Sequence, residues 1–153
     1  MNDLIMLGQL LLSLFLGSLI GLERQLARKP AGFRTYALVS LSSTIFTIIS
    51  ETLALQYANV PNFSFDPSRI ASQIIVGIGF IGAGVIIYQK SKIRGTTTAA
   101  SLWVTAAIGM AVGFKLYTLA ILSTCLVLII LIVFYFFIEN RLEKKVAKKN
   151  EFI

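Results

Sequence analysis

The chain has 153 residues, of which 56% are hydrophobic, with a mean hydropathy of +0.82 and a formal net charge of +7. A soluble domain needs a largely polar surface, so this composition excludes one and predicts an integral membrane protein. Because the bases flank apolar segments, membrane topology and anionic lipid headgroups account for them, and we expect no binding of nucleic acid.

The residues needed for most metal and covalent chemistry are missing. The chain has no histidine, and its one cysteine, Cys125, lies within an apolar run. No lysine lies in an apolar segment to activate a serine, and no glycine motif follows an expected strand to bind a nucleotide phosphate. We therefore expect no enzyme, no cofactor and no metal centre.

Five apolar segments are long enough to cross about 30 Å of hydrocarbon as helices. They cover Leu4–Leu22, Thr35–Leu55, Ile70–Tyr88, Thr96–Phe114 and Leu116–Ile138. The first lacks a basic leader and a small-residue cleavage site, which favours a retained helix over a signal peptide. Since the connections are short, we predict an all-α integral membrane protein, a compact bundle of five transmembrane helices over residues 1–138.

Basic residues alternate between the connections and predict the topology. The first contains Arg24, Arg28, Lys29 and Arg34, the third contains Lys90, Lys92 and Arg94, and the second and fourth contain only Arg69 and Lys115. The positive-inside rule places the first and third connections in the cytoplasm and the N-terminus outside. Five crossings then leave residues 139–153 as a basic cytoplasmic tail, either a helix in the headgroup layer or a solvated segment.

The charged segment Gly21–Thr35 contains one acid, Glu23, directly after an apolar run. A lone carboxylate at that position needs a counter-charge. We predict an ion pair between Glu23 and either Arg34 or Arg94 on another helix end. Such a pair either clamps the helix ends or belongs to a cytoplasmic site for an anion or a protein partner, because seven bases surround one acid at this face.

The third expected span has four glycines within residues 77–84, on two faces of the helix. Small residues let membrane helices approach closely, so we expect this helix to be central and held from both sides, with a functional break as the alternative. The segments Gly17–Gly21 and Gly109–Gly113 are GxxxG motifs, which pair helices within one chain or between chains. The predicted packing residues are Gly17, Gly21, Gly77, Gly79, Gly82, Gly84, Gly109 and Gly113.

In the fourth expected span, Thr97, Ser101 and Thr105 recur every four residues and form a polar stripe. We interpret the stripe as hydrogen bonding between helices, with the lining of a pore or substrate path as the alternative. On the outer side, a hydrated divalent cation would need Asp3, Glu51 and Asp66 to lie close together.

Three blocks of the chain resemble the bacterial MgtC/SapB family. They are Gly21–Gln25 with Ala31–Val39, then Gly77–Ile86, then Arg94–Trp103, in matching order and spacing. The resemblance implies a multi-pass protein of the bacterial inner membrane, associated with magnesium limitation and with survival in macrophages. It also implies a regulator that restrains ATP synthase rather than a magnesium transporter.

Two departures from the family pattern stand out. Better-known members carry a soluble C-terminal domain, and we expect this chain to be a short form without it. A cysteine common after the tryptophan of the third block is Val104 here, so we expect cysteine chemistry to be inessential.

We therefore expect a regulator that contacts another membrane protein, such as ATP synthase, and forms a homo-oligomer, with a dimer favoured. The alternative is a small transporter or channel for an ion or solute. The candidate functional residues are Glu23, Arg24, Gln25, Gly32, Arg34, Thr35, Arg94, Thr97, Ser101 and Trp103.

Overall fold

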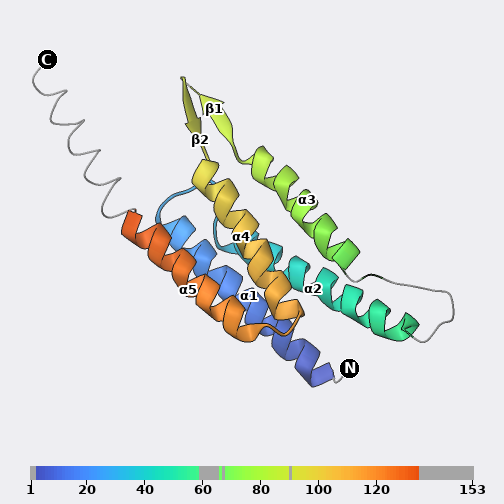
Figure 1. The fold of residues 1–153 in the computed structure, drawn as a ribbon. Helices are drawn as coiled ribbons and strands as arrows, with labels where there is room; N and C mark the ends of the chain where they lie inside the picture. The colour runs from blue at the N-terminus through green and yellow to red at the C-terminus, as the bar shows by residue number, and fades with distance from the viewer. Residues whose placement is uncertain (1–2, 59–65, 67, 90, 135–153) are drawn as a thin grey trace, which may run out of the picture.

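The computed structural model describes residues 3–58, 66, 68–89 and 91–134, and most of them lie in five helices (Figure 1). The helices are α1 (Asp3–Leu26), α2 (Phe33–Tyr57), α3 (Ser68–Gly84), α4 (Thr96–Gly113) and α5 (Tyr117–Phe134). Two short strands, β1 (Ile87–Gln89) and β2 (Lys92–Arg94), form an antiparallel hairpin between α3 and α4. Within this described part the prediction of five helices is confirmed. The expected tail and the last residues of the fifth span lie outside it.

The bundle has an apolar surface and a partly polar interior, the reverse of a soluble domain. Large apolar side chains are exposed along α1, α2 and α5, whereas Gln9, Ser13, Thr44 and Thr105 are buried. Among the described helices, α1, α2 and α4 are long and apolar enough to cross a membrane, while α3 and α5 are apolar but shorter. The fold is that of a helical membrane protein.

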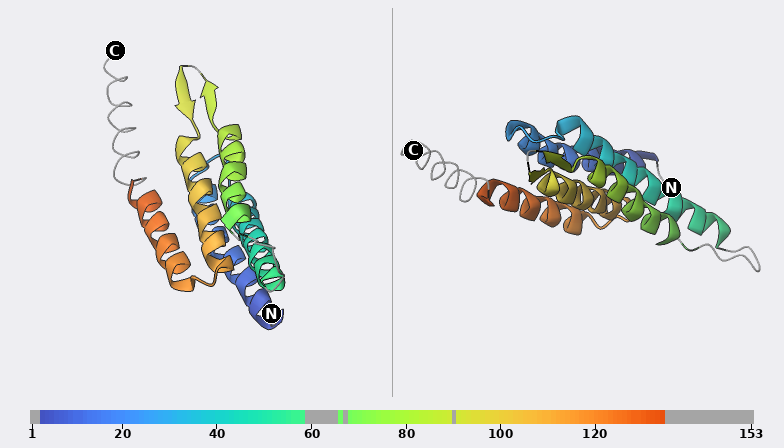
Figure 2. Two further views of the ribbon diagram at one scale, coloured as in Figure 1. Left: turned by 45° about the vertical axis from the view of Figure 1, so that its right-hand side comes forward. Right: turned by 90° about the horizontal axis from the view of Figure 1, so that it is seen from above.

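Helix α4 is the central helix, in contact with α1, α2, α3 and α5 (Figures 1 and 2). Helix α3 lies at the edge of the bundle against α2 and α4, and its buried residues are Ala71, Ile78 and Gly82. The prediction that the third helix is central is therefore wrong. A glycine-rich sequence permits close packing but does not say whether another helix of the same chain uses it.

Glycines bring both α1 and α4 close to α2 at Ser40. A Cβ atom at Gly17 of α1 would lie 2.6 Å from Cβ of Ser40, and one at Gly109 of α4 would lie 2.2 Å from the carbonyl oxygen of Ser40. Gly21 and Gly113 approach α2 almost as closely. Side chains at these positions would separate the helices, so the three-helix unit α1–α2–α4 depends on glycine for its packing.

The third apolar segment, expected to be helical over Ile70–Tyr88, ends as a helix at Gly84. The N–H groups of Val85 and Ile86 donate to carbonyl oxygens only three residues back, at 3.3 and 3.2 Å, which tightens the last turn. The branched side chains that follow favour an extended backbone, and β1 begins at Ile87. The span prediction is corrected here, because hydropathy alone does not separate a helix end from a strand.

Candidate functional site

The bundle has a basic end, defined as the end where α1 and α3 finish and α2 and α4 begin. Here Glu23 binds the neighbouring Arg24, whose Nη2 donates to Oε1 of Glu23 at 2.6 Å and whose Nε donates to Oε2. Arg24 is only 2% exposed. Glu23 therefore neutralises a buried guanidinium on its own helix.

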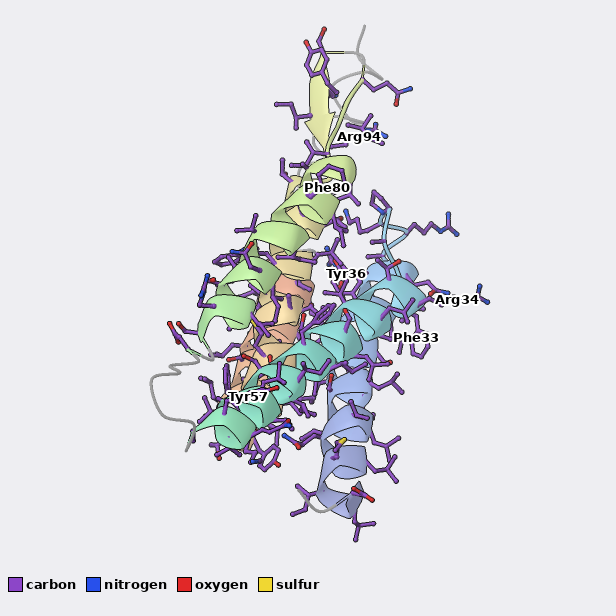
Figure 3. All side chains as sticks on the ribbon, turned by 90° about the vertical axis from the view of Figure 1, so that its right-hand side faces the viewer. Phe33, Arg34, Tyr36, Tyr57, Phe80 and Arg94 are labelled. Atoms are coloured by element: carbon purple, nitrogen blue, oxygen red, sulfur yellow. The ribbon has the colours of Figure 1, made fainter. Side chains whose placement is uncertain are left out.

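The predicted pairing of Glu23 with Arg34 or Arg94 is wrong. The side chain of Arg34 is exposed and points away from the bundle, and Arg94 lies in β2, beyond the helix ends (Figure 3). Adjacent residues point about 100° apart on a helix, but two long side chains can bridge that angle. Arg24, the next residue along the chain, is therefore the partner of Glu23, which the usual three- and four-residue spacing of helix pairs does not indicate.

The turn between α1 and α2 is built by Gln25 and Gly32. Oε1 of Gln25 accepts a hydrogen bond from the N–H of Phe33 at 3.2 Å, which satisfies a free donor at the start of α2. A Cβ at Gly32 would lie 3.0 Å from that oxygen. Two of the predicted functional residues thus shape this turn, and Thr35 lies beside them at the start of α2.

Tyr36 joins α2 to the central helix. Its hydroxyl lies 2.6 Å from Oγ of Ser101, and its side chain is fully buried inside the bundle (Figure 3). The Ser101 hydroxyl also donates a hydrogen bond to the carbonyl oxygen of Thr98, at 3.0 Å. Tyr36 was not among the predicted site residues. An amphipathic aromatic residue at a helix start next to the charged segment was the signal for it.

The polar stripe of α4 differs from the prediction at its first position only. Thr98, Ser101 and Thr105 are buried, whereas Thr97 is exposed. Three consecutive threonines leave the phase of the stripe undecided until a neighbouring helix is placed. Trp103 is half-exposed and borders a cavity of about 130 Å³ between α3 and α4.

The buried hydroxyls of the interior bind helix backbones. Thr105 and Thr47 donate to carbonyl oxygens four residues back, both at 2.8 Å. Thr44 donates across to the carbonyl oxygen of Gly109 at 2.7 Å. The Thr44 bond joins α2 to α4, whereas the Thr105 and Thr47 bonds stay within their own helices, and none of these three donors is directed into a polar path.

The end opposite the basic end contains two further polar contacts. Nε2 of Gln9 donates to the carbonyl oxygens of Val112 and Gly113, both at 2.9 Å, and so caps the end of α4. Nζ of Lys115 lies 2.7 Å from Oε1 of Glu51. Gln9 was missed by the sequence analysis, although an amide within an apolar run was a signal for it.

The acids on this side are not assembled as a metal site. Among the described residues, no group of three acidic, histidine or cysteine side chains could hold an ion. The Asp66 carboxylate instead binds the N–H and hydroxyl of Ser68, at 2.8 and 2.9 Å, and caps the start of α3. These hydrogen bonds, the one from the hydroxyl foremost, lower the pKa of Asp66.

The glycines of α3 are mostly open to the surroundings. A Cβ at Gly77, Gly79 or Gly84 would meet no described atom within 4 Å, and only Gly82 faces another helix, with Ala99 at 3.6 Å. Gly77 lies in a groove of about 380 Å³ that separates α3 from α2 and is lined mainly by apolar side chains. The outer face of α3 is defined here as the open side that carries Gly79 and Phe80.

A sequence model of the MgtC family matches residues 10–140. That match covers the helical bundle from residue 10, within α1, to the end of α5. The chain belongs to the MgtC family. The predicted membership of the MgtC/SapB family is thereby confirmed.

Three relatives of this MgtC-family protein illustrate the match. An uncharacterised protein of Haemophilus influenzae is 45% identical over 130 residues, which cover 84% of this chain and 55% of that protein. The putative magnesium transporter YhiD of Escherichia coli is 45% identical over 116 residues, or 76% of this chain and 54% of YhiD. Protein MgtC of Salmonella typhimurium is 42% identical over 119 residues, which cover 78% of this chain and 48% of that protein.

The chain spans about half the length of these MgtC-family relatives. No solved structure matches it. The matched range, residues 10–140, contains the Glu23–Arg24 pair, Tyr36, Ser101 and the glycines of α3.

Proposed function

We propose that this MgtC-family protein is a regulator that acts on another membrane protein by helix-to-helix contact through the outer face of α3. The observation that carries the proposal is the open space at Gly79, beside Phe80, which is 85% exposed, while Gly17 and Gly109 are filled by neighbouring backbones. Glycine costs about 1 kcal/mol against alanine in a helix interior. An open glycine beside an exposed phenylalanine is explained if a second protein packs against this face.

The interior of the bundle supports a contact role better than a transport role. Glycine packing closes α1, α2 and α4 together, and the hydroxyls between them bind backbone carbonyls. The buried Arg24 is neutralised by Glu23 at one end of the bundle. A permeation path would need polar groups free to replace the water around an ion.

The partner that we propose is a membrane subunit of ATP synthase, whose restraint the family resemblance implies. We place the protein in the bacterial inner membrane with five crossings, the N-terminus outside and the basic end in the cytoplasm, and assign it to adaptation to low magnesium and to survival in macrophages. In this proposal a second copy of the chain packs alongside as a homodimer.

Transport is the second candidate function, and the printed name of the Escherichia coli relative, a putative magnesium transporter, favours it. On this alternative, solute would cross between helices or between copies of the chain. The groove between α2 and α3 has Ser42, Ser43 and Gln73 among otherwise apolar lining residues, which suits a lipid chain or a helix better than a hydrated cation.

A matched pair of substitutions tests the regulatory role. Gly79→Leu places a large side chain on the outer face of α3, where the fold has room for it. Gly8→Leu makes the same change on α1, where a Cβ also meets nothing within 4 Å. We expect both variants to fold, and only Gly79→Leu to lose co-purification with ATP-synthase membrane subunits and restraint of ATP synthesis.

Proteoliposomes containing the purified protein separate the two functions. The regulatory proposal predicts no magnesium flux above that of empty vesicles, with or without Gly79→Leu. Magnesium flux that Gly79→Leu abolishes, together with unaltered ATP synthesis, would overturn the regulatory proposal in favour of transport.

A further inference from the structure

The hairpin between α3 and α4 is amphipathic. Tyr88 lies opposite Ile93, and Gln89 lies opposite Lys92. Opposite residues of an antiparallel pair share a face and neighbouring residues alternate, so Tyr88 and Ile93 form an apolar face. The other face carries Lys92 and Arg94 opposite Gln89 and Ile87. The hairpin projects from the basic end beyond α3 and α4 (Figures 1 and 2).

The apolar face of the hairpin has no cover from the described residues. Tyr88 is 73% exposed and Ile93 is 64% exposed. A two-stranded hairpin is marginally stable in water without packing on one face. The attachment to α4 is nevertheless well defined: Gly95 has a φ of 91°, and a Cβ there would lie 2.0 Å from the carbonyl oxygen of Val85. The surroundings of the molecule must therefore cover this face.

The length of α3 places the hairpin at the membrane boundary. Its 17 residues rise about 25 Å, short of the roughly 30 Å of hydrocarbon. Val85 and Ile86 continue at about 2 Å per residue and Ile87 and Tyr88 at about 3.3 Å per residue, which together adds about 11 Å. An α3 that starts at the opposite interface therefore brings Ile87 and Tyr88 to the boundary between acyl chains and headgroups.

The backbone of the hairpin restricts it to that layer. A two-stranded sheet leaves N–H and C=O groups unpaired along both edges, and hydrocarbon cannot satisfy them. Water and phosphate in the headgroup layer can. Tyrosine is also enriched at this level, because its ring is apolar and its hydroxyl is polar.

The charge at this end selects the kind of lipid. Lys92 and Arg94 are exposed, as are Arg28 and Arg34 in the neighbouring turn and helix start. Among the described residues, the acid at this end is Glu23, which is bound to Arg24. The hairpin therefore carries positive charge that complements anionic phosphate headgroups.

From these observations we infer that the hairpin is an interfacial anchor that binds anionic lipid. Tyr88 and Ile93 insert at the acyl–headgroup boundary, while Lys92 and Arg94 bind lipid phosphates. The inference goes beyond the proposed function and stands apart from it, because it requires no protein partner and no contact by the outer face of α3.

Cysteine labelling in lipid nanodiscs tests the anchor. In a Cys125→Ser background, single substitutions Tyr88→Cys, Ile93→Cys and, as the matched control on the other face, Gln89→Cys are treated with a water-soluble maleimide. In nanodiscs of phosphatidylcholine with phosphatidylglycerol, we expect positions 88 and 93 to react more slowly than position 89. Equal rates at all three positions would overturn the insertion.

The lipid charge is varied in the same experiment. Protection of position 88 should weaken in nanodiscs of phosphatidylcholine alone. In the anionic nanodiscs, Lys92→Gln or Arg94→Gln should each raise the labelling rate about fivefold, the factor equivalent to about 1 kcal/mol per base near an anionic surface. Equal rates in neutral and anionic nanodiscs would overturn the binding of phosphate. ATP-synthase restraint is not measured here, so the outcome is distinct from that of the proposed function.

Discussion

Arg24 is the one charged residue, among those the structure describes, that is almost fully buried. Removing a guanidinium from water is costly, and the two hydrogen bonds from Arg24 to Glu23 offset that cost. Glu23 thus acts first as the counter-charge of its neighbour, and the exposed Arg34 remains available at the surface.

Replacing Glu23 by glutamine tests this pair. Glu23→Gln leaves the buried guanidinium without a counter-charge, which should lower the free energy of unfolding by about 3 kcal/mol. Unfolding in mixed micelles, followed by circular dichroism, measures the change. Arg34→Gln is the control, expected within about 0.5 kcal/mol because the side chain is exposed. If Arg34→Gln lowered the free energy of unfolding more than Glu23→Gln does, the result would contradict the Glu23–Arg24 pair and favour pairing of Glu23 with Arg34 across helices.

Two glycine substitutions distinguish filled from open positions. Gly109→Ala places a Cβ 2.2 Å from the carbonyl oxygen of Ser40, so α2 and α4 must separate. We expect the free energy of unfolding to fall by about 1–3 kcal/mol, roughly the cost of overpacking a core. Gly77→Ala meets no atom within 4 Å and should be neutral or stabilising. The thermal aggregation temperatures of the two purified variants in detergent measure both effects. Equal stability of the two variants would contradict the close packing of Gly109 against α2.

Residue-scale features were predictable where composition decides them. The need of Glu23 for a partner and the burial of Ser101 and Thr105 follow from residue type. The identity of the partner, Arg24, depends on side-chain reach. The choice of Thr98 over Thr97 depends on how α4 is rotated against α2 and α1.

At the scale of elements, α3 is held at its start by a local cap. The Asp66 carboxylate accepts two hydrogen bonds from Ser68, and the N–H of Arg69 donates to the Asp66 carbonyl oxygen at 3.2 Å. The cap satisfies donors that the first turn of a helix leaves free.

The cap should make the start of α3 sensitive to acid. Because the Ser68 hydrogen bonds lower the pKa of Asp66 in the folded protein, the cap is intact above the ordinary aspartate pKa. It is lost as the pH falls through the lowered pKa. Hydrogen exchange of residues 68–72, measured across this range, should show the first turn opening in acid. Asp66→Asn is the control and should remove the pH dependence; an unchanged profile would contradict the cap.

The helices were predictable from the sequence, but their partners and one boundary were not. Apolar runs of about 20 residues located all five helices to within a few residues. The hairpin was missed because Val85–Tyr88 is apolar and hydropathy does not distinguish strand from helix. Its signals were four consecutive residues of high strand propensity and the bases that follow.

At the scale of the whole molecule, the two sets of glycines have different surroundings. Gly17, Gly21, Gly109 and Gly113 lie against helices of the same chain, whereas Gly77, Gly79 and Gly84 face open space. Sequence motifs cannot separate these cases, because GxxxG records a capacity for close approach and not the identity of the approaching helix. Experiments on the outer face of α3 therefore test the regulatory proposal most directly.

The most direct measurement is photo-crosslinking from α3 in bacterial membranes. A photoreactive phenylalanine analogue replaces Phe80, which is 85% exposed on the outer face of α3, and, as the control, Leu126 on α5, which is 60% exposed. The regulatory account predicts an adduct with an ATP-synthase membrane subunit from position 80, absent from position 126 and abolished by Gly79→Leu. No protein adduct from position 80, or equal adducts from both positions, would contradict it.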